Sequence, residues 1–191
     1  DPADDYFKRG VTSTESVSLS TGNQKNQTYL SAGAINSKGI VPNNKYDRYN
    51  FTFRNTTSML EDKMTLDVGA SYIKQEDRNM TNQGQYENPL LGAYLFPRGN
   101  DWNDIKMFER YNVARKIYVQ HWPVGDGGLT MQNPYWINYR QLPENSKDRY
   151  MHNANPNYKV LDGLGISARI RTDKTVNHYP ERFYAYTNTQ R

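Results

Sequence analysis

The sequence predicts an all-β protein, an antiparallel up-and-down sheet of about six strands with one long structured loop. Three observations lead to this fold class. Apolar and polar residues alternate along several stretches, and short and long connections alternate between those stretches. Aromatic residues also make up 13% of a chain whose hydrophobic content is only 36%. A disordered chain would not carry so many aromatic rings, so the chain is expected to fold.

The alternation is clearest in three stretches, 49–54, 64–72 and 164–171. Aromatic residues occupy the odd positions of the first, and apolar residues occupy the even positions of the other two. Successive side chains of a strand point to opposite faces, so each stretch is expected to form a strand with one apolar face. Weaker versions of the pattern occur around Val17 and Leu19, from 29 to 35 and from 150 to 158.

Pro156 lies inside the last of these stretches. Proline has no backbone N–H to donate to a sheet. We therefore expect a bulge or an early strand end at this position.

The connections between the strands are of two kinds. Short segments with turn-forming composition are expected at 22–26, 60–63 and 162–163. Longer connections are expected at 37–44, at about 77–149, and from about Asn177 onwards. Short turns on one side and long loops on the other are typical of outer-membrane β-barrels, whose short turns are periplasmic. The sequence therefore predicts an antiparallel up-and-down transmembrane β-barrel section, with its apolar strand faces outward. These faces comprise Tyr49, Phe51 and Phe53 together with Met64, Leu66, Val68, Ala70 and Tyr72.

The long connection, 77–149, is expected to be a structured extracellular loop. It contains all three tryptophans and an apolar stretch at 89–97. A helix is expected over 104–118, with Ile105, Phe108, Val113 and Ile117 loosely on one face. A connection of this length with its own apolar residues is more often a folded, functional loop than a flexible one.

Composition excludes several classes of function. The net charge of +4 arises from 24 basic and 20 acidic residues spread along the chain, which is not the dense basic stripe of a nucleic-acid-binding protein. The chain has no cysteine, and its three histidines are far apart, so neither a metal nor another cofactor is expected. No catalytic constellation stands out, so the protein is not expected to be an enzyme. The chain opens at Asp1 without an initiator Met or a signal-peptide pattern, as expected of a mature protein or a fragment.

A series of stretches then carries a family resemblance: 7–10, 16–20 with the turn at Gly22, 37–44, 88–90, 94–99, 133–136 and 149–151. In order and spacing they resemble the early barrel section of SusC/RagA-family TonB-linked outer-membrane proteins. The resemblance implies a Bacteroidetes-type importer of glycans or peptides in the bacterial outer membrane, with a large barrel of about 22 strands. It also implies a plug domain and remaining strands that are absent from this chain, contact with TonB through the missing N-terminal part, and a SusD-like surface lipoprotein as partner. Outer-membrane lipid would surround the barrel, and no nucleic acid is involved.

Aromatic residues of the long loop are the candidate contacts for substrate or partner, because aromatic faces suit the apolar side of a sugar ring. The alternative for each ring is a place in the internal core of the loop. Arg54, Arg169 and Arg171 are placed on polar strand faces, where they either line a channel or hydrogen-bond within a packed lumen. The candidates are Tyr86, Tyr94, Arg98, Trp102, Trp122, Tyr135 and Trp136, with Tyr111 as a further ring of the same loop.

A secreted β-sandwich carbohydrate-binding module is the alternative to the transporter. Both classes give alternating strands and turn signals. The length of the 77–149 connection favours the transporter, because a small sandwich rarely tolerates so long a loop.

Overall fold

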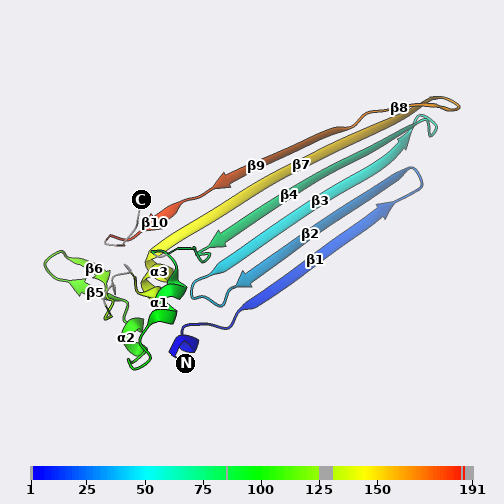
Figure 1. Cartoon of the computed structure of the whole chain (residues 1–191). Helices are drawn as coiled ribbons and strands as arrows, with labels where there is room; N and C mark the ends of the chain where they lie inside the picture. The colour runs from blue at the N-terminus through cyan, green and yellow to red at the C-terminus, as the bar shows by residue number, and fades with distance from the viewer. Residues whose placement is uncertain (1, 85, 125–130, 186, 188–191) are drawn as a thin grey trace.

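The computed structural model describes residues 2–84, 86–124, 131–185 and 187. It is an all-β structure, in which a long antiparallel sheet ends in a small cap of short helices and loops (Figure 1). Successive strands run up and down, each paired with the one before it. They are β1 (Val11–Gly22), β2 (Asn26–Lys38), β3 (Lys45–Met59), β4 (Met64–Arg78) and β7 (Gln141–Leu161).

Three further segments form one edge of the sheet and all pair with β7. They are β8 (Leu164–Ser167), β9 (Ile170–His178) and β10 (Glu181–Phe183). Their registers are continuous with one another, so together they behave as a single interrupted strand and complete a six-strand meander. The expected all-β, antiparallel arrangement is confirmed. Within the described residues the sheet stays open, with β1 at one edge and β8–β10 at the other.

The short turns lie where the sequence predicts them, at one end of the sheet. Gly22 ends β1 with φ 150°, and the Asn23 side chain accepts hydrogen bonds from the backbone N–H groups of Lys25 and Asn26, both at 2.8 Å. At the last hairpin Gly163 has φ 87°, a backbone conformation that favours glycine. The longer connections, 39–44 and 79–140, lie together at the opposite end (Figure 1).

Two predicted boundaries are wrong. The long connection is 79–140 rather than 77–149, because β4 continues to Arg78 and β7 begins at Gln141. The third long connection does not begin at Asn177, since β9 continues to His178 and β10 resumes the pairing with β7. In both regions most strand residues are polar, so no alternation marked them as strands.

Pro156 does not end β7, so the expected strand end is wrong. The Pro156 carbonyl accepts a hydrogen bond from the Ala168 N–H of the edge strand at 3.0 Å. Proline has no N–H to return a second hydrogen bond to that strand. The interruption therefore falls in the neighbouring strand, between β8 and β9. A register shift does occur in β7, but between Lys159 and Leu161.

The cap is formed mainly by 79–140. It contains α1 (Pro89–Leu95), α2 (Asn103–Lys106), the hairpin β5 (Glu109–Asn112) and β6 (Ile117–Gln120), and α3 (Pro134–Arg140), and the short helix η1 (Pro2–Asp5) lies beside it. Asn88 and Asn133 cap α1 and α3, each followed by proline in the first helical turn. The helix expected over 104–118 is wrong: only Asn103–Lys106 is helical, and a β-hairpin follows it.

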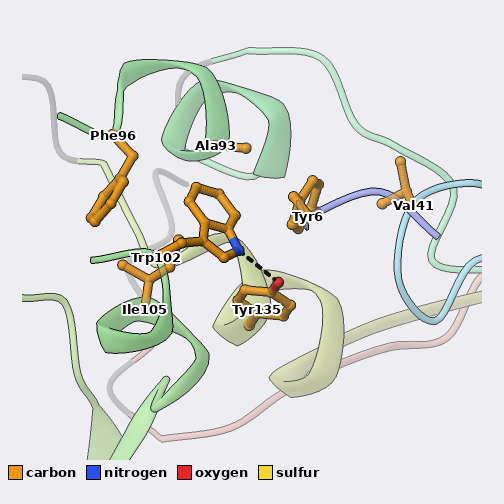
Figure 2. Packing of buried hydrophobic residues seen from close by; sticks show 7 residues of the cluster. All are labelled: Tyr6, Val41, Ala93, Phe96, Trp102, Ile105 and Tyr135. Carbon is orange, nitrogen blue, oxygen red and sulfur yellow. Dashed lines mark hydrogen bonds between the residues drawn. The ribbon is translucent and has the colours of Figure 1, made fainter. Parts of the chain in front are cut away.

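Hydrophobic residues buried from solvent gather in the cap (Figure 2). The sheet is a single layer across the described residues, so it has no second layer to pack against. No helix in the described part of the chain is long and apolar enough to cross a membrane. The cluster comprises Tyr6, Val41, Ala93, Phe96, Trp102, Ile105 and Tyr135.

Candidate functional site

The two faces of the sheet differ in chemistry. Residues paired directly across neighbouring strands lie on the same face. The register pairs Ala32 with Phe51, Phe51 with Tyr72, and Tyr72 with Tyr150, which places these side chains together. We call this side the apolar face and the opposite side the polar face. The apolar face also carries Val17, Leu19, Leu30, Tyr49, Phe53, Leu66, Val68 and Ala70.

The apolar part of this face has a defined length along the strands, which is clearest on β4. Alternate residues from Met64 to Tyr72 are apolar or aromatic, a span of about 27 Å at roughly 3.4 Å per residue. Lys74, Glu76 and Arg78 continue the same face towards the cap. The sequence prediction that the apolar sets of β3 and β4 share one face is therefore confirmed.

Large apolar side chains on this face are open to solvent. Leu19 is 57% exposed, Leu30 44% and Phe51 51%. A monomeric soluble protein rarely exposes a continuous apolar surface of this kind, so an apolar environment or partner is expected to cover it. Where the small residues Ala32 and Ala70 lie, the face forms a shallow depression of about 420 Å³.

An aromatic row lies between the apolar and charged parts of this face. Phe51 stacks on Tyr72 with ring centroids 6.5 Å apart, and Tyr72 lies 5.0 Å from Tyr150. The Tyr72 hydroxyl donates to Asp148 at 2.5 Å, so the polar end of this ring points towards the charged part. Aromatic rings with one apolar body and one polar tip suit a boundary between apolar and aqueous surroundings.

The polar face forms a larger hollow of about 1510 Å³. Arg54 and Arg171 line it, as do Asp67 and Asp173. Asp173 is paired with Arg149 through two hydrogen bonds, at 2.9 and 2.5 Å. The structure thus places two of the three predicted arginines in one hollow, whereas Arg169 is exposed between β8 and β9.

Among the predicted contact residues, Trp102, Tyr135 and Trp136 are buried, with 4%, 5% and 0% exposure. Trp102 Nε1 donates to the Tyr135 hydroxyl at 3.2 Å (Figure 2), and Trp136 Nε1 donates to Thr187 Oγ1 at 3.1 Å. Trp122 is half-buried against Phe96, with ring centroids 6.2 Å apart. Trp102 and Tyr135 therefore belong to the buried cluster of the cap, and Trp122 packs against it, which is the alternative named for each ring. Trp136 is also buried, but outside that cluster.

The other predicted contacts are more open. Tyr94 is 66% exposed, with its ring 6.2 Å from Phe7, and Arg98 is also exposed. Tyr86 is half-buried, and its carbonyl accepts a hydrogen bond from Gln132 at 2.7 Å. Contact of any of these residues with substrate or partner stays a prediction.

A buried asparagine network, which the sequence pattern did not reveal, ties the cap to segments that flank the strands at the same end of the sheet. Asn138 Nδ2 donates to the hydroxyl of Tyr6, and the Asn138 carbonyl accepts from Asn43 at 2.8 Å and Asn79 at 3.1 Å. Burial raises the pKa of Tyr6, which keeps the phenol neutral inside the cap. Because the partners are far apart in the chain, no local signal pointed to them.

One ion pair of the cap joins α3 to β5. Arg140 donates to both carboxylate oxygens of Glu109 at 2.8 Å, and its guanidinium lies 5.2 Å from the Phe108 ring centroid. Burial and the nearby charge of Arg110 lower the pKa of His121. Among the described residues there is no group of three or more acidic or histidine side chains placed to hold a metal ion.

Comparison with protein-family models gives no match to the chain. Comparison with curated proteins gives none either. The chemistry of the two sheet faces and of the cap therefore carries the functional argument.

Proposed function

We propose that the chain is a section of the β-barrel of an outer-membrane TonB-dependent nutrient importer of the SusC/RagA kind. The single observation that carries this proposal is the exposed apolar face on long antiparallel strands. Its apolar set on β4 spans the nine residues from Met64 to Tyr72, within the roughly 9–11 residues that a tilted strand needs to cross a bilayer, and an aromatic row borders it.

The two ends of the sheet support an up-and-down arrangement across a membrane. Tight turns gather at one end, and the longer connections and the folded cap gather at the other. In outer-membrane barrels the short turns are periplasmic and the long loops extracellular. The proposal therefore places the cap outside the cell, on the side that receives substrate and a SusD-like lipoprotein.

The polar face is the lumen side in this proposal. Its hollow is lined by hydroxyl, amide, arginine and carboxylate side chains, as expected of a surface that meets water and polar solutes. Glycans or peptides are the proposed cargo, and the role is transport rather than catalysis. Contact with TonB is assigned to a part of the importer outside this chain.

The β-sandwich alternative has less support. A sandwich buries the apolar face of one sheet against a second sheet about 10 Å away. In the described residues the only other sheet is the small β5–β6 hairpin, which lies in the cap. The apolar face of the large sheet is therefore left uncovered.

Spin labels placed on adjacent residues test the proposal. With the protein inserted in outer-membrane lipid, labels at Phe51 and Leu66 should collide with lipid-soluble oxygen, because these residues lie on the apolar face. Labels at Thr52 and Asp67, one residue along each strand, should instead be reached by a water-soluble quencher. Access of the water-soluble quencher to Phe51 and Leu66 would overturn the proposal.

A further inference from the structure

The apolar residues of the apolar face do not lie at one height across the sheet. On β2 and β3 they occupy alternate positions of 30–34 and 49–53, and on β4 alternate positions of 64–72. On the edge formed by β8 and β9 they occupy alternate positions of 164–170. The pairing register shows how far these apolar runs are displaced from one another along the strands.

The displacement is measured along β7, which pairs with both β4 and the β8–β9 edge. We call residues level when an unbroken series of cross-strand pairs joins them. The apolar run on β1 is 17–19, and its midpoint, Ser18, is level with Met151. The midpoint of the run on the β8–β9 edge is Ser167, which pairs with Asn157. The two runs are therefore displaced by six residues along β7, from 151 to 157.

This displacement makes the apolar surface an oblique band. Six residues span about 20 Å along a strand, and the five strand spacings from β1 to the β8–β9 edge span about 24 Å across the sheet. The band therefore runs at about 40° to the line that joins level residues. Strands of membrane barrels are tilted by about 35–45° from the membrane normal, so a flat lipid layer crosses them at this angle. The oblique band comprises the alternate residues of 17–19, 30–34, 49–53, 64–72, 154–158 and 164–170.

Polar residues continue the apolar face of β3 on the tight-turn side of the band. Asn55 Nδ2 donates to Asn26 Oδ1 and to Thr28 Oγ1, both at 2.8 Å, and Thr57 Oγ1 donates to Asn55 Oδ1 at 2.6 Å. Asn55 is nevertheless level with Val68, the centre of the apolar run on β4. A lipid layer at right angles to the strands would therefore cover this polar cluster as well.

A charged residue lies on the cap side of the band at the β8–β9 edge. Thr172 and Lys174 continue the face of 164–170, and Lys174 is exposed. Lys174 is level with Phe51 and Tyr72. A lipid layer at right angles to the strands would bring its ammonium group into the hydrocarbon, which is unfavourable. The two polar groups thus lie at opposite corners of the face, as an oblique band requires.

We propose that membrane lipid covers the apolar face along the oblique band, with the strands inclined at about 40° to the membrane normal. Asn55 and Thr57 then lie at the head groups of the periplasmic leaflet. Lys174 lies at the head groups of the outer leaflet, where its ammonium group pairs with lipid phosphate. The inference rests on the proposed importer and deepens it, because it states which part of the apolar face lipid contacts.

Spin labels at level positions test the inclination, in the intact importer inserted in outer-membrane lipid. Ala32 and Lys174 are level, with four strand spacings between them. In an inclined sheet the label at Lys174 should lie about 12 Å nearer the outer surface than the label at Ala32. A water-soluble quencher should reach the label at Lys174, whereas the label at Ala32 should collide mainly with lipid-soluble oxygen.

A second level should give the opposite order. Thr57 is level with Pro156, whose carbonyl accepts a hydrogen bond from the Ala168 N–H at 3.0 Å. Three strand spacings should place the label at Thr57 about 9 Å nearer the periplasmic surface than the label at Ala168. Here the water-soluble quencher should reach the label on β3, and the label on the β8–β9 edge should lie in lipid.

Phe51 supplies the control, because it pairs directly with Ala32. Labels at these two positions should differ by only about 3 Å in depth, since one strand spacing separates them. If the label at Thr57 disturbs the hydrogen bond to Asn55, the comparison of Ala32 with Lys174 decides the result alone.

Equal depths at Ala32 and Lys174, or a label at Lys174 deeper in lipid than the label at Ala32, would overturn the inference. The lipid contacts of labels at Phe51 and Leu66 would stand in both cases, so this failure is distinguishable from a failure of the importer proposal. Loss of those lipid contacts would overturn the importer proposal and this inference with it.

Discussion

Phe51 and Tyr72 face each other across β3 and β4 with nearly parallel rings, their centroids 6.5 Å apart and their planes 13° apart. The pair lies where the apolar face becomes charged, since Lys74 is the next residue of β4 on that face. Aromatic rings are enriched at such levels in membrane barrels, between the hydrocarbon and the head groups. In the importer proposal, the pair marks the outer edge of the lipid-facing band.

A charge placed in the middle of that band should be costly. Val68 is at the centre of the Met64–Tyr72 span. Val68→Arg is expected to lower the free energy of unfolding in lipid vesicles by about 2–4 kcal/mol, because an arginine near the midplane loses its hydration. Urea titration of the inserted protein measures this change.

The polar face supplies the control for Val68. Ser71→Arg introduces the same side chain on the same strand, but on the opposite face. Its effect should be much smaller, because water reaches the lumen side. An equal loss of stability for both variants would contradict the assignment of the two faces.

Replacement of Gly92 in α1 by alanine should destabilise the cap, although Gly→Ala usually stabilises a helix. In an ordinary helix interior, Gly→Ala stabilises by about 0.5–1 kcal/mol. A Cβ on Gly92, however, would meet the backbone carbonyl oxygen of Gln132 at 2.6 Å, so α1 and the segment before α3 must move apart. Gly92→Ala is expected to destabilise the cap by about 1–3 kcal/mol through overpacking.

Tryptophan fluorescence during denaturation measures this effect selectively, because Trp102, Trp122 and Trp136 all lie in the cap. Gly99→Ala is the control, since nothing lies within 4 Å of the added atom. Equal stability of the two variants would show that α1 does not approach Gln132 as closely as the structure describes.

The buried phenol of Tyr6 predicts a loss of cap stability at alkaline pH. Burial raises the pKa of Tyr6 above its ordinary value of 10.0. The contribution is therefore complete below pH 10.0 and is lost as pH rises towards the folded-state pKa, because the unfolded chain releases the proton first. Tyr135 adds to this loss of cap stability at alkaline pH. Burial raises the pKa of Tyr135, although the hydrogen bond from Trp102 acts in the opposite direction.

The variant Tyr6→Phe separates the contribution of Tyr6 from that of Tyr135. At neutral pH it should cost about 1–3 kcal/mol, because the buried Asn138 amide loses its acceptor. Above pH 10.0 its cap stability should fall less steeply than that of the unchanged chain. Tyr94→Phe, at an exposed ring, should alter neither value. A Tyr6→Phe variant with an unchanged alkaline slope would contradict this role for the phenol.

The sheet could be predicted from the sequence because its signals are local. Apolar and polar residues alternate along 64–72 because one face of that strand is apolar. Asn23 indicates a turn because its side chain bonds to the nearby backbone, and Gly163 because it can adopt a positive φ. The strand residues 141–149 escaped prediction because most of them are polar and show no alternation. They are strands because β4 and β10 pair with them, which is a non-local cause.

The cap was less predictable for the same reason. Ile105, Phe108 and Ile117 have spacings compatible with a helix, but the Asn112 side chain stabilises a turn between them and the chain folds into a hairpin. The tryptophans were recognised as a group, yet their spacing did not show which would be buried. That depends on Tyr6 and Phe96, which lie elsewhere in the chain.

The orientation of the sheet predicts a pattern of protease cleavage on whole cells. Arg110, Arg115 and Lys116 are exposed on the hairpin of the cap, whereas Lys25, Lys63 and Lys159 lie at the tight turns. Trypsin added to intact cells that carry the importer should cut at the cap, because the proposal places it outside. The lysines at the turns should resist until the outer membrane is opened, because the proposal places them in the periplasm.

Mass spectrometry of the released peptides distinguishes the two sets. Arg115→Gln with Lys116→Gln should remove the early cuts at the hairpin tip without changing those at the turns. Early cleavage at the turns with a protected cap would reverse the orientation, and the cap would then have no access to external substrate.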